Sequence, residues 1–168
     1  FVDKGKILGS SFSVGSADIK LLQDVAGGVD IGNLVDEKTG PTFEGVSPNW
    51  TSDYLIKIYN NAAGQLQITS NANYETINDP DDLRQIIFVE PISWNDSNGD
   101  GIFDAGEEGT SFGRKTIVKW KTEGFDFGTI NSGNVLSLIL RFSTDTVSDT
   151  KQGSTGIFDF EFDSIGLE

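Results

Sequence analysis

The sequence predicts an all-β fold, a jelly-roll-like antiparallel β-sandwich of about seven to eight strands with an extending N-terminal strand. Two observations support this prediction. No long segment places apolar residues at the helical spacing i, i+3, i+4 and i+7, and the 20 glycines are scattered along the chain. Several segments instead alternate apolar and polar residues, which is typical of a strand with one buried face. With 168 residues, the chain is long enough for one domain with its own core.

The clearest alternation lies in two C-terminal segments. In residues 135–143, the even positions from Leu136 to Phe142 are all apolar and share one face of a strand. In residues 156–163, three aromatic residues alternate with three carboxylates, so we expect Phe158, Phe160 and Phe162 in the core and Asp159, Glu161 and Asp163 in solvent.

Five further segments have strand composition and complete the sandwich. They are residues 11–23, 54–60, 65–70, 84–93 and 114–122. Residues 25–41 are rich in Gly and Asp, which predicts a long connection or a short hairpin.

The first ten residues are predicted to form a unit of their own, a donor strand and hinge ahead of a single sandwich domain at 11–168. Residues 1–8 are an additional short strand, separated from the next by the joint Gly9-Ser10-Ser11. The chain begins at Phe1 and contains no Met. We therefore expect an upstream export signal to have been removed and the mature chain to be secreted; removal of a tag is the alternative.

Composition excludes several classes of function. With no Cys and no His, the chain cannot build thiol catalysis, a Ser-His-Asp triad or the common zinc sites. The net charge of −14 disfavours nucleic acid and anionic membranes as partners and favours cations. No run of eighteen apolar residues occurs, so we expect no membrane span.

A calcium-binding loop is predicted at residues 96–107. The segment fits D-x-[DN]-x-[DN]-G-x₅-E at every position. Because Ca²⁺ takes six to eight hard oxygen ligands, the spacing assigns it the Ile102 carbonyl and the side chains of Asp96, Asn98, Asp100, Asp104 and Glu107. Gly101 allows the sharp turn. Strand-like flanks indicate a structural site of the extracellular kind, with a Kd of roughly 0.1 to 1 mM. A merely soluble acidic hairpin is the alternative.

Other candidate sites have a structural alternative. The three tryptophans, Trp50, Trp94 and Trp120, would suit a sugar-stacking platform, but large aromatic residues are mostly buried and we expect Trp94 and Trp120 in the core. Asn49 and Asn95 begin N-glycosylation sequons. The run Asp79-Pro80-Asp81-Asp82 predicts a solvated turn or a second cation site.

The N-terminal pattern resembles a known family. Phe-x-Asp at the start is followed by Gly-x-x-Phe-x-x-Gly-x-x-Asp-x-Lys-Leu at residues 9–21, which is similar to the mature N-terminus of the TasA/camelysin family of secreted fibre proteins. Residues 43–68 resemble the family's proline turn and following strand, with Pro48-Asn49 where the family has Pro-Gly. The resemblance implies a β-sandwich subunit of a biofilm-matrix filament, in which Phe1, Val2, Ile7 and Leu8 insert into the neighbouring subunit.

The sequence therefore predicts a structural subunit of an extracellular filament or cell-surface fibre. It would form a homopolymer by N-terminal donor-strand exchange, carry structural Ca²⁺, and have fibres that bundle through calcium. The alternative is a monomeric calcium-stabilised module that binds carbohydrate or cell wall. Some camelysin relatives carry a metalloprotease label, but a chain without His has no His-Glu-x-x-His motif, and we expect no enzyme.

Overall fold

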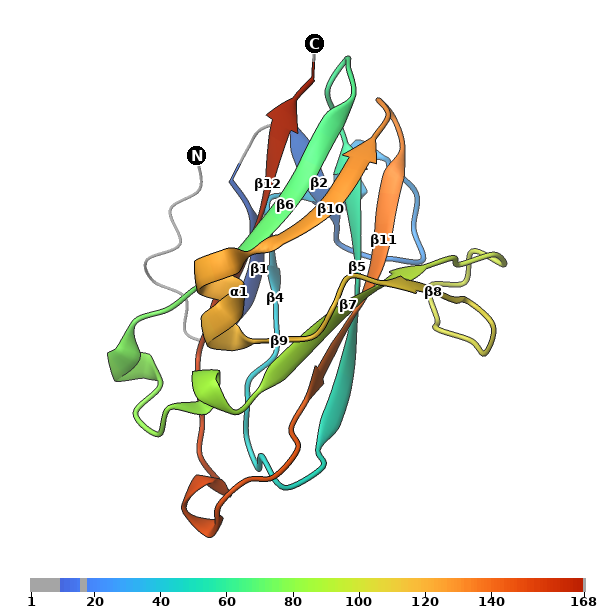
Figure 1. The fold of residues 1–168 in the computed structure, drawn as a ribbon. Coiled ribbons are helices and arrows are strands. Elements are labelled where there is room, and N and C mark those ends of the chain that lie inside the picture. Colours follow the sequence, from blue (N-terminus) through green and yellow to red (C-terminus); the bar gives the residue numbers. More distant parts are fainter. Residues whose placement is uncertain (1–9, 16–17, 168) are drawn as a thin grey trace.

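In the computed structural model, residues 10–15 and 18–167 are described. They form two β-sheets that pack face to face, which confirms the predicted all-β sandwich (Figure 1). The predicted donor strand, with Phe1, Val2, Ile7 and Leu8, lies outside the described residues.

Twelve strands are found among the described residues, more than the predicted seven to eight. Sheet A has the strand order β10 (Phe125–Ile130), β6 (Leu66–Asn73), β12 (Asp159–Gly166), β1 (Ser11–Val14), β4 (Glu37–Thr39). Sheet B has the order β3 (Leu34–Val35), β2 (Ile19–Leu22), β5 (Thr51–Asn60), β11 (Val135–Ser143), β7 (Phe88–Trp94), β8 (Glu108–Ser111), and β9 (Lys115–Thr116) also pairs with β7. Strands β1 and β12 are parallel, and the other described pairs are antiparallel.

Strands β11 and β12 fulfil the two strongest sequence predictions. β11 lies in the middle of sheet B and pairs with β5 and β7, and its apolar face is buried at Leu138, Leu140 and Phe142. In β12 and just before it, the three phenylalanines are at most 1% exposed, while the alternating carboxylates are half-buried. Period-two alternation therefore identified both core faces correctly.

The main core between the sheets is rich in aromatic rings. Trp120 stacks on Phe160 with 4.5 Å between ring centroids, and Phe43 meets Phe142 and Phe158 edge to face. A smaller cluster, which we call the outer cluster, lies on the opposite face of sheet B. It consists of buried Ile92, Trp94 and Ile139 with Val25, Leu55 and Phe103 packed against them.

The single strand predicted at residues 11–23 is wrong. β1 belongs to sheet A and β2 to sheet B, so Phe12 and Leu21 reach the same core from opposite layers. The chain leaves sheet A at Gly15, where any Cβ would lie 2.1 Å from the Asp163 carboxylate. A larger residue at this position would require the Asp163 side chain to move. Beyond Gly15 the chain passes from sheet A to sheet B.

The strand predicted at residues 114–122 is also wrong, because its second half is the α-helix α1 (Ile117–Glu123). The Thr116 hydroxyl accepts a hydrogen bond from the Lys119 N–H and caps the helix, and Gly124 ends it at φ 69°. Ile117 and Trp120 are three residues apart on one face and are both fully buried. Burial of this pair overrides the β-propensity of the β-branched and aromatic residues.

Smaller corrections concern segment ends and connections. The strand predicted at 84–93 begins later, after the 3₁₀ turn η3 (Leu83–Gln85), and the strand predicted at 65–70 continues to Asn73. The connection at 25–41 contains the turn η1 (Ile31–Asn33) and strands β3 and β4, one in each sheet. Two further 3₁₀ turns are η2 (Thr76–Asn78) and η4 (Asp149–Lys151).

Candidate metal centre

The predicted calcium loop is the connection of a hairpin in sheet B. It joins β7 to β8, and the Asn95 N–H donates to the Glu107 carbonyl at 2.9 Å across its neck. Residues 96–107 therefore start and end next to each other at the rim of a rigid sheet, and they lie beyond the strand ends (Figure 1).

Short-range hydrogen bonds to the loop's own backbone fold its first half. The Asp96, Asn98 and Asp100 side chains accept from backbone N–H groups two to five residues further on, at 2.9 to 3.2 Å. Gly99 and Gly101 both have φ 71°, a left-handed conformation that favours glycine. This alternation of Asx turns and glycines gives the predicted motif residues a tightly wound backbone.

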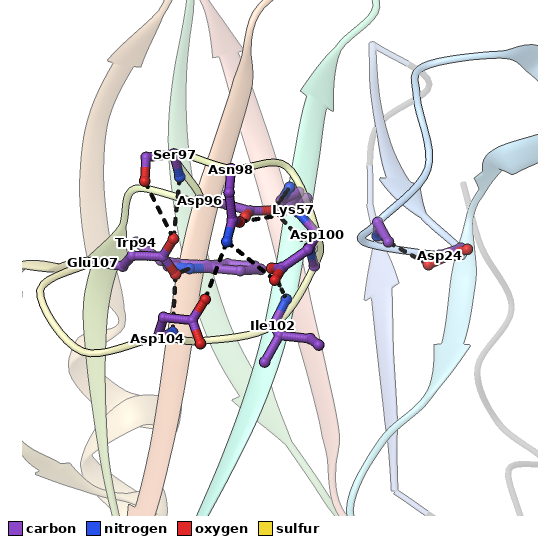
Figure 2. Close-up of polar contacts among 12 residues, drawn as sticks. Asp24, Lys57, Trp94, Asp96, Ser97, Asn98, Asp100, Ile102, Asp104 and Glu107 are labelled. Atoms are coloured by element: carbon purple, nitrogen blue, oxygen red, sulfur yellow. Dashed lines mark hydrogen bonds and ion pairs between the residues drawn. The ribbon is translucent and has the colours of Figure 1, made fainter.

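Glu107 is the most fully bonded carboxylate of the loop. It is 6% exposed, and one oxygen accepts from the Trp94 indole N–H at 3.1 Å and the Asp104 N–H at 3.0 Å (Figure 2). Its other oxygen accepts from the Ser97 N–H and hydroxyl. The backbone N–H of Asp104, followed by the Trp94 indole, lowers the pKa of Glu107 below its ordinary 4.5, so the group stays ionised.

Asp96 is a buried carboxylate with one oxygen left over. Its side chain is 3% exposed, and its Oδ2 accepts from Lys57 Nζ at 2.9 Å and from the Gly101 N–H at 3.0 Å. Its Oδ1 is buried and has no hydrogen-bond partner. The bond from Lys57 is the largest cause that lowers the pKa of Asp96 below 3.8. A charged carboxylate with a buried lone oxygen is the ligand chemistry of a hard cation.

Asn98 lies between the remaining two carboxylates. Its Nδ2 donates to Asp100 at 3.1 Å and to Asp104 at 3.2 Å, and all three side chains are exposed (Figure 2). The Asn98 amide N–H groups therefore bridge the two carboxylates, as a bound cation would do. Binding of Ca²⁺ would require this amide to turn its oxygen inward, a rotation of one exposed side chain.

The donor set fits calcium, although its oxygens are not yet gathered. Among the described residues, no three acidic side chains converge on one point. Four carboxylates occupy a twelve-residue loop, and Lys57 is the ammonium bonded to one of them. Hydrogen bonds link Asn98 to Asp100 and Asp104, and Asp104 to Glu107, while the Ile102 N–H is bonded to Asp100. The Asp96 side chain is bonded instead to Lys57 and to the Gly101 N–H.

The loop also rests on apolar support. Phe103 packs against the outer cluster, and Lys57 Nζ lies 4.8 Å from the centre of the Trp94 ring. On its other side the loop touches residues 23–30, since a Cβ on Gly101 would lie 2.7 Å from Ala26. Sequence reasoning missed Lys57 and Ala26, because neither is near the loop in the chain. For Trp94, the only sequence signal of its contact with the loop was its position, two residues before Asp96.

The tryptophans and the sequon residues differ in how far they are exposed. Trp94 and Trp120 are 4% and 0% exposed, as predicted, and Trp50 is half-buried against Phe43. Trp94 and Trp120 therefore cannot form a stacking platform for sugar. The sequon residues Asn49 and Asn95 are both exposed.

The turn at residues 79–82 is solvated only in part. Pro80 and Asp82 are exposed as predicted, whereas the Asp79 side chain is fully buried. The Asp79 oxygens accept from the Leu83 N–H at 2.8 Å and from the Arg84 guanidinium at 2.9 Å, so the protein itself bonds both of them.

Comparisons with protein-family models, with curated proteins and with solved structures find no match for this chain. Within residues 10–15 and 18–167, no helix is long and apolar enough to span a membrane.

Proposed function

We propose that this chain is a secreted structural subunit of an extracellular filament, held together by donation of its N-terminal strand and stabilised by Ca²⁺ in the 96–107 loop. The proposed role is non-catalytic. The observation that carries it is the order and spacing of residues 1–22, which resemble the N-terminus of the TasA/camelysin fibre proteins.

The way the body begins supports a donated N-terminal segment. Ser10 is 1% exposed; its hydroxyl accepts from the Phe158 N–H at 3.0 Å and its carbonyl accepts from the Gly40 N–H at 2.7 Å. The Ser11 hydroxyl donates to Asp159 at 2.9 Å. Both serines of the predicted joint therefore belong to the sandwich, and any movement of a donor segment would begin at Gly9 or before it.

The body also closes a core from Ser11 onward. Buried residues from Phe12 to Phe162 form one continuous cluster between the sheets. In the proposed filament, the apolar side chains of residues 1–8 serve a neighbouring subunit, where an extended segment adds main-chain hydrogen bonds and places alternate side chains in pockets. A contact of this kind is heterologous and propagates as a fibre.

Calcium would act as a structural ion in this proposal. Asp96, Glu107, Asp100 and Asp104 are the carboxylates that would hold it, and its positive charge would offset their mutual repulsion. An ion that binds only the folded loop, with a Kd of roughly 0.1 to 1 mM, stabilises it by about 1 to 3 kcal/mol at about 5 to 10 mM calcium. The net charge of −14 also favours calcium bridges between acidic fibres, which predicts bundling that a chelator reverses.

Electron microscopy tests the proposal directly. The full chain in millimolar calcium should form filaments, while a chain without residues 1–8 and a full-length Ile7→Glu variant should stay monomeric with unchanged circular dichroism. The matched control Ile77→Glu changes an exposed isoleucine in the body and should still polymerise. Monodisperse particles from the full chain would refute the filament function.

A further inference from the structure

Sheet B carries an exposed apolar patch at its β3 edge. Ile31 is 93% exposed and Val29 is 42% exposed, although both are large aliphatic residues. They belong to the connection between β2 and β3, next to half-buried Leu34. Exposed apolar groups gathered beside a pocket mark an interaction surface more often than isolated ones do.

A cavity of about 390 Å³ lies within this patch. Its lining combines three aliphatic side chains, Val29, Ile31 and Leu34, with three that carry a polar group, Lys20, Tyr59 and Asn61. Lys20 and Tyr59 are directly opposite each other on β2 and β5 and alternate with core residues, so the cavity opens on the outer face of sheet B. Lys20 is neutralised by Asp36 at 2.6 Å. The cavity therefore suits a small number of aliphatic or aromatic side chains.

The connection that carries the patch is braced. Asn33 donates from its amide to the carbonyls of Asp24 and Gly28 at 3.0 and 2.8 Å, and accepts from the Asp24 N–H at 2.8 Å. Val25 packs into the outer cluster. The exposure of Ile31 is thus a feature of an internally bonded loop.

We propose that this patch receives residues 1–8 of a second copy of the chain. The inference rests on the proposed filament function and names its acceptor surface. Residues 1–8 supply four large apolar side chains for the cavity, together with two lysines, Lys4 and Lys6, against one carboxylate, Asp3. The connection beside the cavity presents the exposed carboxylates of Asp24 and Asp30. A basic, apolar segment and an acidic rim around an apolar cavity are complementary in both respects.

The placement of the two surfaces favours a chain of subunits. The segment ahead of Ser10 enters at β1 in sheet A, whereas the patch lies on the outer face of sheet B. Donor and acceptor are therefore different surfaces in different layers of the sandwich. A contact between unlike surfaces repeats from subunit to subunit and does not close on itself as a two-fold dimer does.

The calcium loop contacts the connection that carries this patch, at residues that precede Val29 and Ile31. Gly101 lies against Ala26, and Phe103 and Val25 share the outer cluster. Calcium that fixes the 96–107 loop would therefore also fix the connection that bears Val29 and Ile31. We expect docking to be tighter in calcium than in chelator.

Cross-linking between single-cysteine variants tests the acceptor, because the chain has no cysteine of its own. Full-length Leu8→Cys carrying a size tag is mixed with full-length Ile31→Cys in millimolar calcium and oxidised mildly. We expect a mixed disulfide dimer on a non-reducing gel. Leu8→Cys with Ile77→Cys is the matched control, since Ile77 is 80% exposed and also lies in a 3₁₀ turn.

A second pair of variants covers the case in which a cysteine disturbs the contact. Ile31→Ser should weaken self-association at least tenfold by sedimentation, whereas Ile77→Ser should not change it. Absence of the mixed dimer together with equal association of both serine variants would overturn the inference. If the unmodified chain still forms filaments in that case, only the acceptor is wrong; if it forms none, the filament function fails as well.

Discussion

Two acidic turns of this sandwich solve the same electrostatic problem in different ways. At residues 79–84, buried Asp79 has both oxygens bonded, one by the Leu83 N–H and the other by Arg84. At residues 96–107, buried Asp96 has one oxygen bonded by Lys57 and Gly101 and the other without a partner. The first turn is completed by the protein alone, whereas the second has room for a further positive charge. Buried carboxylates need such completion because desolvation disfavours the charged form.

The largest effect is expected from Arg84→Met in the first turn. Removal of the guanidinium leaves Asp79 buried without its ion-pair partner, which should lower the free energy of unfolding by about 3 kcal/mol. Because no metal takes part there, the loss should be the same in calcium and in chelator. Chemical denaturation in both buffers measures it, and a calcium-dependent loss would contradict the comparison.

The effect of Glu107→Gln on stability should, by contrast, depend on calcium. The neutral amide keeps the size of the side chain but removes the charge that calcium requires, so the calcium-linked gain of about 1 to 3 kcal/mol should vanish. Thermal unfolding of both proteins with 5 mM calcium chloride or EDTA tests this; the concentration is about five- to fiftyfold above the expected Kd. Glu123→Gln, an exposed change on α1, is the control and should leave the calcium effect intact. A calcium shift that persists in Glu107→Gln would remove Glu107 from the site.

Acid should remove the same calcium-linked gain. The pKa values of Asp96 and Glu107 are lowered in the folded chain, so their contribution to stability is complete above their ordinary values of 3.8 and 4.5. That contribution is lost as the pH falls through the lower folded-state values, and calcium binding is lost with it. Because the chain has no His, stability should vary little between pH 5 and 8. Thermal scans from pH 8 to 2 check this, and a calcium effect that disappears by pH 6 would contradict it.

The smallest effect is expected from Lys57→Met, which keeps the apolar stem over Trp94 but removes the ammonium next to Asp96. Without this positive charge the loop should bind calcium about three- to tenfold more tightly, because like charges repel in a partly desolvated site. Lys115→Met, in the lysine–glutamate pair between β9 and α1, is the control and should not change calcium affinity. Unchanged affinity in Lys57→Met would show that the ammonium does not oppose the ion.

Local sequence patterns predicted those features of the fold that are set by neighbouring residues in the chain. The alternation in β11 and β12 identified their buried faces, and the twelve-residue motif located the hairpin loop. The sequence did not show to which of the two sheets each strand belongs. Nothing within residues 11–23 shows that the chain changes sheets near Gly15, because the partners that place β1 and β2 in different sheets, β12 and β5, lie far along the chain. The helix at 117–123 was missed because Thr116 and Gly124 had to outweigh strand-forming residues between them.

The candidate site shows the same division. Its predicted ligands follow from the spacing of residues in one short segment, so the sequence alone is enough to name them. Lys57 reaches Asp96 from a strand 39 residues away, and Ala26 meets Gly101 from a different connection. These contacts depend on which strands become neighbours in sheet B and on how the outer cluster packs. They become visible only when the tertiary structure is known.

Isothermal titration of the full chain with calcium chloride at pH 7, beside Glu107→Gln, tests directly whether residues 96–107 bind calcium. We predict one Ca²⁺ bound per loop with a Kd of roughly 0.1 to 1 mM in the unmodified chain, and no measurable binding at these concentrations in the variant. No binding up to 10 mM calcium, about tenfold above the weakest expected Kd, or equal binding by both proteins would contradict it.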